Sequence, residues 1–576
     1  MKIADKLHGY LYPLVLICII LTHINISYFI PNFLHAQFFA SALIIILFLI
    51  QLYFTLTTSE TIRFNLIDLL VLSFYGYLLL NNIFFAHNIF REEFINFSSV
   101  FCIYYFVRCH RLESNANFIY LQITALLIII IEAIYCFLQW KNVIPNLNSN
   151  YKIGGSYGHP AFTAVSISVV IPYLIYPLGK YPFNKIFVKS IFFIFILTLL
   201  LLFKLESRAA VLSAILSFTA IFVLPDIKEL KKLKAVVAAF LVASIIFAVV
   251  FIKSDSSLGR IFVWQKCLTV INENLFFGVG FGRFAFEYNK YQSLFFSGLS
   301  QNTKEALLAD YSESAFNEFF QVGVEMGLLG VVLFVALIAC LFCCKNNKPE
   351  TKPFFNAVLC AFVPLFVGWS VLRYFPISCF FFISLAILAK QNRESFIFKL
   401  NNKIALHVFS AIIPISLVLF VYNRSNHFSI NVSILNDKEL KYADNLNSAF
   451  KELQHSDNYV YKYCEFLMKD GQYAKAKLVA EKSSLWLNSP TLYHILYQIH
   501  YQQNDFAKAN QDLDYLINIS PSKIYPKYAL ARLFYTSGEK RKGDSLTEVI
   551  LKIRPKIVNA DVLLMKEELK THLNKK

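Results

Sequence analysis

The sequence predicts an all-α, polytopic helical membrane protein with about 13 transmembrane helices and a C-terminal α-helical repeat domain. The 576 residues are 57% hydrophobic and only 16% charged, whereas soluble globular chains carry about 45–50% apolar and about 25% charged residues. Long apolar runs fill most of residues 1–422, and the polar remainder repeats with a period near 34 residues. The composition excludes a disordered chain, a fibrous protein and a soluble enzyme of ordinary surface.

Each transmembrane helix is predicted from a run of about 20 mostly apolar residues, the length that crosses the hydrocarbon core of a bilayer. The first run lacks a small-residue cleavage site, so we expect it to be a retained span and not a signal peptide. The thirteen predicted spans lie near residues 11–31, 35–56, 64–85, 92–108, 117–140, 160–178, 187–203, 207–225, 234–252, 314–344, 354–371, 374–390 and 404–422.

The positive charges predict the orientation of these spans, because Lys and Arg gather in short cytoplasmic loops. With a cytoplasmic N-terminus, the inside segments carry nineteen Lys and Arg residues and the short outside loops carry six. The net charge of +17 is therefore attributed to orientation in the membrane and not to a nucleic-acid partner. A transmembrane domain is predicted over 1–422, with a large outer loop over about 253–313, and an extracytoplasmic domain over 423–576.

The extracytoplasmic tail contains an internal repeat. The segment GQYAKA at 471–476 matches DFAKA at 505–509 at an offset of 33, and GEKRKG at 538–543 follows at an offset of 34. Pro521 and Pro555 are also 34 residues apart. This period is typical of tetratricopeptide repeats, in which stacked helix hairpins form a scaffold that binds a partner protein. A generic helical bundle is the alternative.

Three charged residues lie between two adjacent spans, in a connection too short to form a domain: Lys204, Glu206 and Arg208. Charged groups at such positions are functional candidates. An Arg at the membrane surface suits a phosphate or diphosphate headgroup, because its planar fork holds two oxygens at once. The alternative is a cation that extends to the interface without a ligand.

The long outer loop begins with Arg260 and Trp264, which share one helix face because they are four residues apart. A cation beside an aromatic ring suits an anionic or sugar ligand, and a stabilising Arg–Trp stack is the alternative. Further along, Gly278, Gly280 and Gly282 precede Arg283. These glycines follow no strand of a βαβ unit, so a tight backbone turn is favoured over a dinucleotide site.

The loop ends in a polar stripe that enters the tenth span. Asn317, Gln321 and Glu325 lie on one helix face, and Glu318 points to the neighbouring face. The stripe predicts either a site or a packing interface between helices, and Gly327 and Gly330 further along allow close helix packing.

A glycine-rich turn precedes the sixth span at 154–159. His159 at its end could exchange a proton, but a helix-capping role is favoured. Glu132, inside the fifth span, is expected to be paired or protonated.

In this order, these segments resemble the bacterial O-antigen ligase family of membrane glycosyltransferases, which also contains O-antigen polymerases and protein O-oligosaccharyltransferases. The resemblance covers roughly residues 150–390. It rests on four motifs: the turn 158–163, Ser207-Arg208, Gly259-Arg260 with Trp264 and Gly278-x-Gly280, and Asn317 with Gly327 and Gly330.

The resemblance implies an enzyme of the bacterial inner membrane that uses no cofactor and no metal. Its donor is a glycan on a polyprenyl diphosphate, and its acceptor is a lipid, a glycan or a protein. Arg208 and Arg260 are then expected to bind the diphosphate, with Lys204, Trp264, Asn317, His159 and Arg283 in the substrate-binding region. Members often carry a His before the Asn of the last motif, where this chain has Phe316, so Glu318, Glu313 or His159 is left as the catalytic base.

Three alternatives remain at this point. A polymerase of the same family fits the same motifs. A transporter would show inverted repeats and paired broken helices near the membrane midplane, and the sequence shows no such pair. A non-catalytic assembly factor would depend on the repeat domain and not on Arg208 and Arg260.

Overall fold

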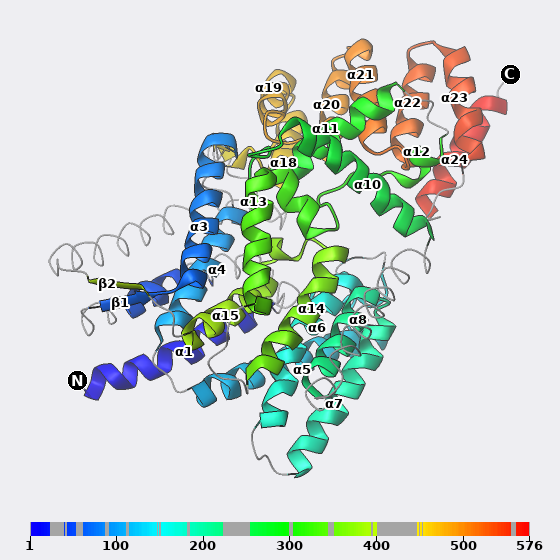
Figure 1. Ribbon diagram of the computed structural model, residues 1–576. Coiled ribbons are helices and arrows are strands. Elements are labelled where there is room, and N and C mark those ends of the chain that lie inside the picture. Colours follow the sequence, from blue (N-terminus) through cyan, green and yellow to red (C-terminus); the bar gives the residue numbers. More distant parts are fainter. Residues whose placement is uncertain are drawn as a thin grey trace. The chain divides into compact units, whose positions relative to one another are not determined.

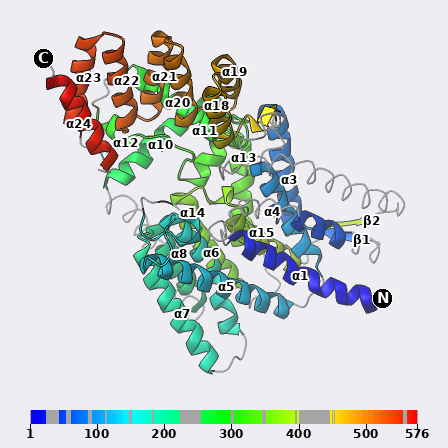
Figure 2. The ribbon, with the colours of Figure 1, turned by 180° about the vertical axis from the view of Figure 1, so that it is seen from behind.

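A computed structural model gives the fold, and the described residues form two compact units that are each assembled from discontinuous segments (Figures 1 and 2). Unit 1 comprises 1–252, 275–282 and 316–423, and unit 2 comprises 253–274, 283–315 and 424–576. Within these limits the structure describes residues 2–23, 40, 43–52, 61–86, 92–110, 114–146, 148, 151–180, 185–222, 254–298, 303–343, 351–392, 396–399, 446–447, 450–451, 453–553 and 560–574.

Unit 1 is a bundle of apolar helices. Among the described residues, four helices are long and apolar enough to cross a membrane, and six shorter apolar helices accompany them. The composition of these helices is that of a multi-pass membrane protein; the predicted spans 234–252 and 404–422 lie outside the described residues. The α-helices of unit 1 are α1 (Lys2–His23), α3 (Leu66–Asn81), α4 (Glu92–Cys109), α5 (Ser114–Trp140), α6 (Pro160–Lys180), α7 (Lys185–Lys204), α8 (Arg208–Phe222), α13 (Glu318–Cys343), α14 (Lys352–Gly368) and α15 (Phe375–Gln391). They are accompanied by a short π-helix, η3 (Asn82–Ala86), and two 3₁₀ helices, η4 (Gly155–Tyr157) and η6 (Val371–Arg373).

Helix α15 lies at the centre of this bundle. Every residue from Phe375 to Ala389 is buried, which is expected of a helix that is apolar on all sides. Helix α7 shows the opposite pattern, because Phe193, Leu200 and Phe203 are each about 60% exposed. Such an apolar outer face suits a helix that contacts lipid.

One small sheet was not predicted. Strand β1 (Thr61–Phe64) pairs antiparallel with β2 (Phe396–Lys399), with Thr61 opposite Lys399. Both segments are rich in the β-branched and aromatic residues that favour strands. The all-α prediction therefore fails for these eight residues.

Helix α13 is interrupted at Gly327, which has φ 65° and ψ −166°. The interruption leaves backbone groups without their helical partners, and the segment 275–282 supplies new ones. The N–H groups of Val279 and Gly280 donate to the carbonyls of Val324 and Glu325 at 2.9 and 3.0 Å. In the reverse direction, the Leu328 N–H donates to the Leu275 carbonyl at 2.8 Å. The Gly-x-Gly motif is thus a backbone pairing segment, and not only the tight turn that the sequence suggested.

Two side chains of α3 complete this arrangement. The Tyr77 hydroxyl donates to the Met326 carbonyl at 2.6 Å, which is another group freed by the interruption. The Asn81 amide donates to the Phe277 carbonyl at 2.6 Å and accepts from the Phe281 N–H at 2.9 Å. Segment 275–282 is therefore held on one side by α13 and on the other by α3.

The close approach requires glycine on both sides. A Cβ at Gly278 would lie 2.5 Å from the Glu325 carbonyl carbon, and a Cβ at Gly327 would lie 2.4 Å from the Phe276 carbonyl carbon. Both glycines also have positive φ. Any side chain at either position would push the two backbones apart.

We expect Gly278→Ala and Gly327→Ala each to lower the free energy of unfolding by more than about 2 kcal/mol, because a left-handed backbone alone costs an L-residue about 1–2 kcal/mol and the backbone clash adds to it. The matched control is Gly76→Ala in α3, where an added Cβ meets nothing within 4 Å. Thermal unfolding of the purified full chain in detergent measures all three. An equal melting temperature for the control and the two variants would contradict the pairing.

Unit 2 contains the repeat region, a row of helix hairpins closed by a last helix (Figure 1). The first helices of the hairpins begin at 457, 490 and 524, and the second helices at 473, 506 and 540, so both series advance by 33 and then 34 residues. The predicted period is therefore confirmed, and the assignment to tetratricopeptide repeats stays a prediction. The helices are α18 (Asp457–Lys469), α19 (Tyr473–Ser483), α20 (Pro490–Gln502), α21 (Phe506–Ile519), α22 (Ile524–Thr536), α23 (Lys540–Lys552) and α24 (Ala560–Asn574).

Each hairpin turns through the same backbone motif. Gly471, Asn504 and Gly538 occupy equivalent positions with φ of 75°, 58° and 84°. The N–H of the next residue bonds to a carbonyl five residues earlier in every case, as in Gln472 to Leu467. This is the C-terminal motif that favours glycine or asparagine in the left-handed conformation.

Most of the predicted outer loop also belongs to unit 2. It forms α10 (Ser254–Glu273), α11 (Phe284–Ser297) and α12 (Lys304–Leu308), and α11 packs against α21. The Gln292 amide donates to the Ile519 carbonyl at 2.9 Å, and the Asn488 amide donates to the Phe286 carbonyl at 3.0 Å. The loop helices and the repeats thus share one folded body.

Candidate functional site

The glycine-rich turn before α6 is held by polar side chains of α5. The Glu132 carboxylate accepts from the Ser156 N–H at 3.0 Å and from the Ser156 hydroxyl. The Gln139 side-chain oxygen accepts from the N–H groups of Gly154 and Gly155 at 2.9 and 2.8 Å. The expectation that Glu132 is paired is confirmed, and its role is to fix this turn.

His159 follows directly from this fixed turn. Its Nδ1 accepts from the Ala161 N–H at 3.2 Å, so the favoured capping role is confirmed. The same bond places the proton of the neutral ring on Nε2. Partial burial lowers the pKa of His159, which keeps the ring neutral at physiological pH.

The His159 ring belongs to an aromatic cluster that we define as His159, Phe162, Phe316, Trp369 and Tyr374. Ring centroids are 4.9 Å apart for His159 and Phe162, 5.1 Å for Phe162 and Trp369, and 5.8 Å for Phe316 and Trp369. The cluster joins the turn before α6, the start of α13 and the connection from α14 to α15. Two segments that the sequence flagged separately, 158–163 and 316–318, therefore meet here.

Asn317 and Glu318 attach the start of α13 to the α14–α15 connection. The Asn317 side-chain oxygen accepts from the Phe319 and Phe320 N–H groups at 2.9 and 3.2 Å, and its amide donates to the Val367 carbonyl at 3.2 Å. Glu318 is 2% exposed and accepts from the Leu372 N–H at 3.0 Å. The sequence predicted either a site or a packing interface for this stripe, and these contacts are those of a packing interface.

Phe316 precedes this interface with a strained backbone. Its φ is 52°, a region that costs a residue with a large side chain on the order of 1–3 kcal/mol. Strain of this kind persists only where neighbours impose it. Here the cap at Asn317 and the edge contact with Trp369 supply that constraint.

The α7–α8 turn places Lys204 at the last residue of α7 and Arg208 at the first residue of α8. Between them, Glu206 has φ 53°, and the carbonyl of buried Ser207 accepts the Val211 N–H at 3.0 Å. Two cations are therefore brought to one tight turn, and Arg208 lies at a helix N-terminus, where anions bind favourably.

Lys204 also marks one end of an apolar groove of about 700 Å³ between α5 and α7. Nearly all of its lining is aliphatic or aromatic, and the polar exceptions include Thr198 and Lys204 itself. The residues that define it include Ile130, Phe137 and Trp140 from α5, and Ile194, Leu197 and Leu201 from α7.

The other predicted residues lie in unit 2. Arg260 is partly buried on α10, four residues before Trp264, whose indole N–H donates to the Ala315 carbonyl at 2.9 Å. Arg283 pairs with Glu287 at 3.2 Å, and its guanidinium lies 4.9 Å from the Phe286 ring centre. The structure therefore groups Lys204 with Arg208, and His159 with Asn317 and Glu318, while Arg260, Trp264 and Arg283 belong to the second unit.

Sequence reasoning missed Asn81, Tyr77 and Trp369. Asn81 carries the clearest signal, because an Asn-Asn pair inside an apolar run is costly unless it is hydrogen-bonded. Tyr77 and Trp369 carry no such signal, since an aromatic residue in a span is ordinary packing.

Residues 193–335 match the family model for O-Antigen ligase. The match covers about a quarter of the chain, from within α7 to within α13. It is narrower than the resemblance predicted from sequence, and His159 lies outside it. No curated protein sequence matches the chain significantly. The chain thus carries, over residues of both units, a region similar to O-antigen ligases within a multi-pass helical protein.

We expect Glu318→Gln to keep the free energy of unfolding within about 1 kcal/mol of the wild type, because the amide oxygen still accepts the Leu372 N–H. Glu318→Ala leaves that buried N–H without its partner and is expected to cost about 1–3 kcal/mol. Thermal unfolding of the full chain measures both. Equal melting temperatures for Glu318→Ala and wild type would show that the bond contributes nothing.

Proposed function

We propose that this protein is a membrane glycosyltransferase of O-antigen ligase type. It transfers a glycan from a polyprenyl-diphosphate carrier to a lipid, glycan or protein acceptor at the outer face of the inner membrane. The observation that carries the proposal is the O-Antigen ligase match over residues 193–335, the region that contains Arg208, Arg260 and Asn317.

The groove between α5 and α7 supports a lipid-linked donor. Its lining is apolar over most of its length, which suits a polyprenyl chain, and Lys204 stands at one end. Arg208 lies four residues beyond Lys204, at the N-terminus of α8. A chain in the groove would therefore bring its diphosphate to two cations and a helix N-terminus, which all favour a bound anion.

The proposed reaction breaks one bond and forms another. The acceptor hydroxyl oxygen attacks the anomeric carbon of the donor sugar, and the bond from that carbon to the diphosphate oxygen breaks. The leaving polyprenyl diphosphate carries the new negative charge, which Arg208 and Lys204 stabilise. The hydroxyl proton passes to a base.

Glu318 is the proposed base, and its burial leaves a positioning role as the competing interpretation. Because Glu318→Gln is expected to fold, its activity separates the two roles. A base predicts at least a 100-fold loss of transfer, in line with the usual contribution of about 10²–10⁴-fold. A positioning residue predicts activity close to that of the wild type, measured on donor extracted from host membranes.

The cations of the α7–α8 turn provide the main test. We expect Arg208→Ala to abolish complementation of a deletion strain and Lys204→Ala to weaken it, with glycan accumulating on the polyprenyl carrier. The matched control is Lys189→Ala, an exposed cation near the other end of α7. Carrier-linked and surface glycans are profiled together in each strain.

The profile also separates the sub-classes. Long chains that accumulate on the carrier indicate a ligase or a protein glycosyltransferase, and single repeat units indicate a polymerase. Full complementation by Arg208→Ala would overturn the proposed diphosphate contact and would favour a scaffold or a transporter.

A further inference from the structure

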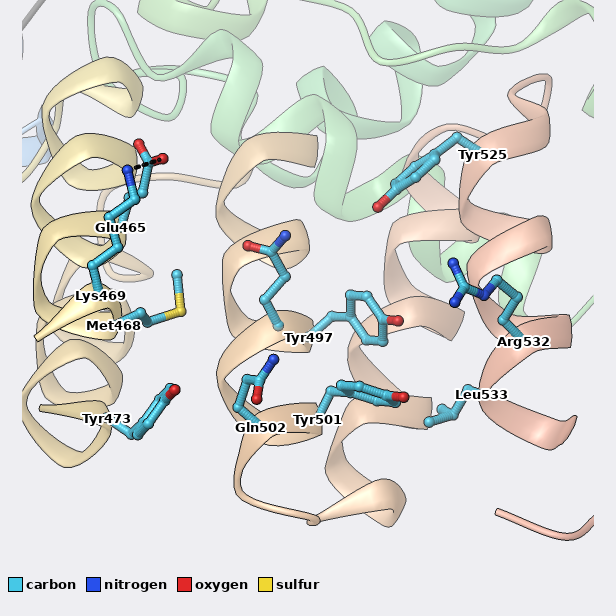
Figure 3. Close-up of a pocket in the computed structure, with 11 residues that line it drawn as sticks. Glu465, Met468, Lys469, Tyr473, Tyr497, Tyr501, Gln502, Tyr525, Arg532 and Leu533 are labelled. Carbon is cyan, nitrogen blue, oxygen red and sulfur yellow. Dashed lines mark ion pairs between the residues drawn. The ribbon is translucent and has the colours of Figure 1, made fainter. Parts of the chain in front are cut away.

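The repeat region has a groove that the proposed reaction does not use. A hollow of about 420 Å³ lies between α18, α20 and α22 (Figure 3), within the 300–1,000 Å³ that ligand sites usually occupy. Figure 3 shows side chains from all three helices directed into the space between them. Every lining residue belongs to unit 2, so the groove is formed by one folded body.

Tyrosine rings dominate the lining. Tyr497 and Tyr501 are one turn apart on α20, with ring centres 5.9 Å apart. Tyr473 begins α19, and Tyr525 on α22 is 38% exposed. The buried apolar residues of α20, such as Leu492 and Ile499, lie on another face of the helix. Tyr497 and Tyr501 are only partly buried: they pack against the hydrophobic core and they also line the groove.

The lining also holds uncharged donors and acceptors. Gln498 and Gln502 add amide groups beside the tyrosine hydroxyls. Burial raises the pKa of Tyr497, and it raises the pKa of Tyr525 to about 12. Both hydroxyls therefore stay protonated at neutral pH, and that of Tyr525 already bonds to His494 Nδ1 at 3.1 Å.

The charges of the groove are paired within the protein. Lys469 Nζ lies 3.0 Å from the Glu465 carboxylate, and Arg532 Nε lies 3.5 Å from the Glu568 carboxylate. Each cation therefore has a carboxylate partner on the protein, in an ion pair that is exposed to solvent. The lining thus offers flat aromatic faces and neutral hydrogen-bonding groups.

We propose that this groove binds a segment of glycan chain. A pyranose ring has a face of C–H groups, which packs on a tyrosine ring, and a rim of hydroxyls, which bonds to amides and phenols. Lys469 and Arg532 lie in exposed ion pairs, which are weak, so the choice of glycan over an acidic peptide rests on the tyrosine rings and neutral amides that make up most of the lining. The inference rests on the proposed function in one respect, which is the choice of the host's carrier-linked glycan as the probe.

The test measures binding to the full-length chain in lipid nanodiscs. The probe is the oligosaccharide released by mild acid from the polyprenyl-linked glycans of the host and labelled with a fluorophore at its reducing end. Fluorescence polarisation reports the Kd. We expect the double variant Tyr497→Ala/Tyr501→Ala to raise Kd by at least about tenfold, and Tyr497→Phe/Tyr501→Phe to change it by less than about threefold, because the rings remain.

The controls separate the groove from folding and from the transfer site. Leu478→Ala, at a residue of the same region that is 50% exposed, should leave Kd unchanged. Arg208→Ala should bind the probe like wild type even where transfer is lost, so the groove and the proposed reaction can fail independently. Melting temperatures verify that each variant folds.

Three outcomes overturn the inference. The wild type does not bind the probe, or the double Ala variant binds it as well as the wild type does. In the third, Arg532→Gln and a rise in salt from about 50 to 500 mM each weaken probe binding tenfold, which would show that recognition of charge, and not packing on the tyrosine rings, holds the probe.

Discussion

The backbone of α13 imposes the constraint on which unit 1 depends. A helix that is interrupted where little water is available must find other partners for its free N–H and carbonyl groups. Segment 275–282 supplies these partners, with Gly278 and Gly327 in contact. The chain therefore leaves unit 2 after Asn274, pairs with α13 over eight residues and returns to unit 2 at Arg283. Parts of the predicted outer loop therefore belong to each of the two units.

The same requirement explains why many polar residues of unit 1 serve the fold. Glu132 holds a glycine turn, and Asn317 and Glu318 join α13 to the α14–α15 connection. These contacts use groups that sequence alone cannot distinguish from catalytic ones. Lys204, in the α7–α8 turn, lies instead at the end of an apolar groove, four residues before Arg208. That placement, and not the polar stripe, is the basis of the proposed contact with a lipid-linked anion.

The sequence predicted what is encoded locally. Apolar runs located the helices of unit 1, and the spacing from Gly471 to Gly538 gave the period of the repeats. It could not predict that Gly278 pairs with Glu325, that Asn81 holds the intervening segment or that β1 meets β2, because each pairing joins residues far apart in the chain. For the candidate site, it singled out Lys204 and Arg208, but the convergence of 158–163 with 316–318 required the fold.

A groove for glycan on the same chain has a physical consequence for transfer. A long glycan in solution reaches the transfer site rarely, but one bound elsewhere on the same chain is present there at a raised effective concentration. The tyrosines of α20 are suited to weak binding, since flat rings contact a sugar with little loss of side-chain entropy. Weak binding also allows the glycan chain to slide along the groove or to dissociate from it after transfer. The repeat domain would then contribute by retaining the glycan polymer, and it would take no part in forming the new glycosidic bond.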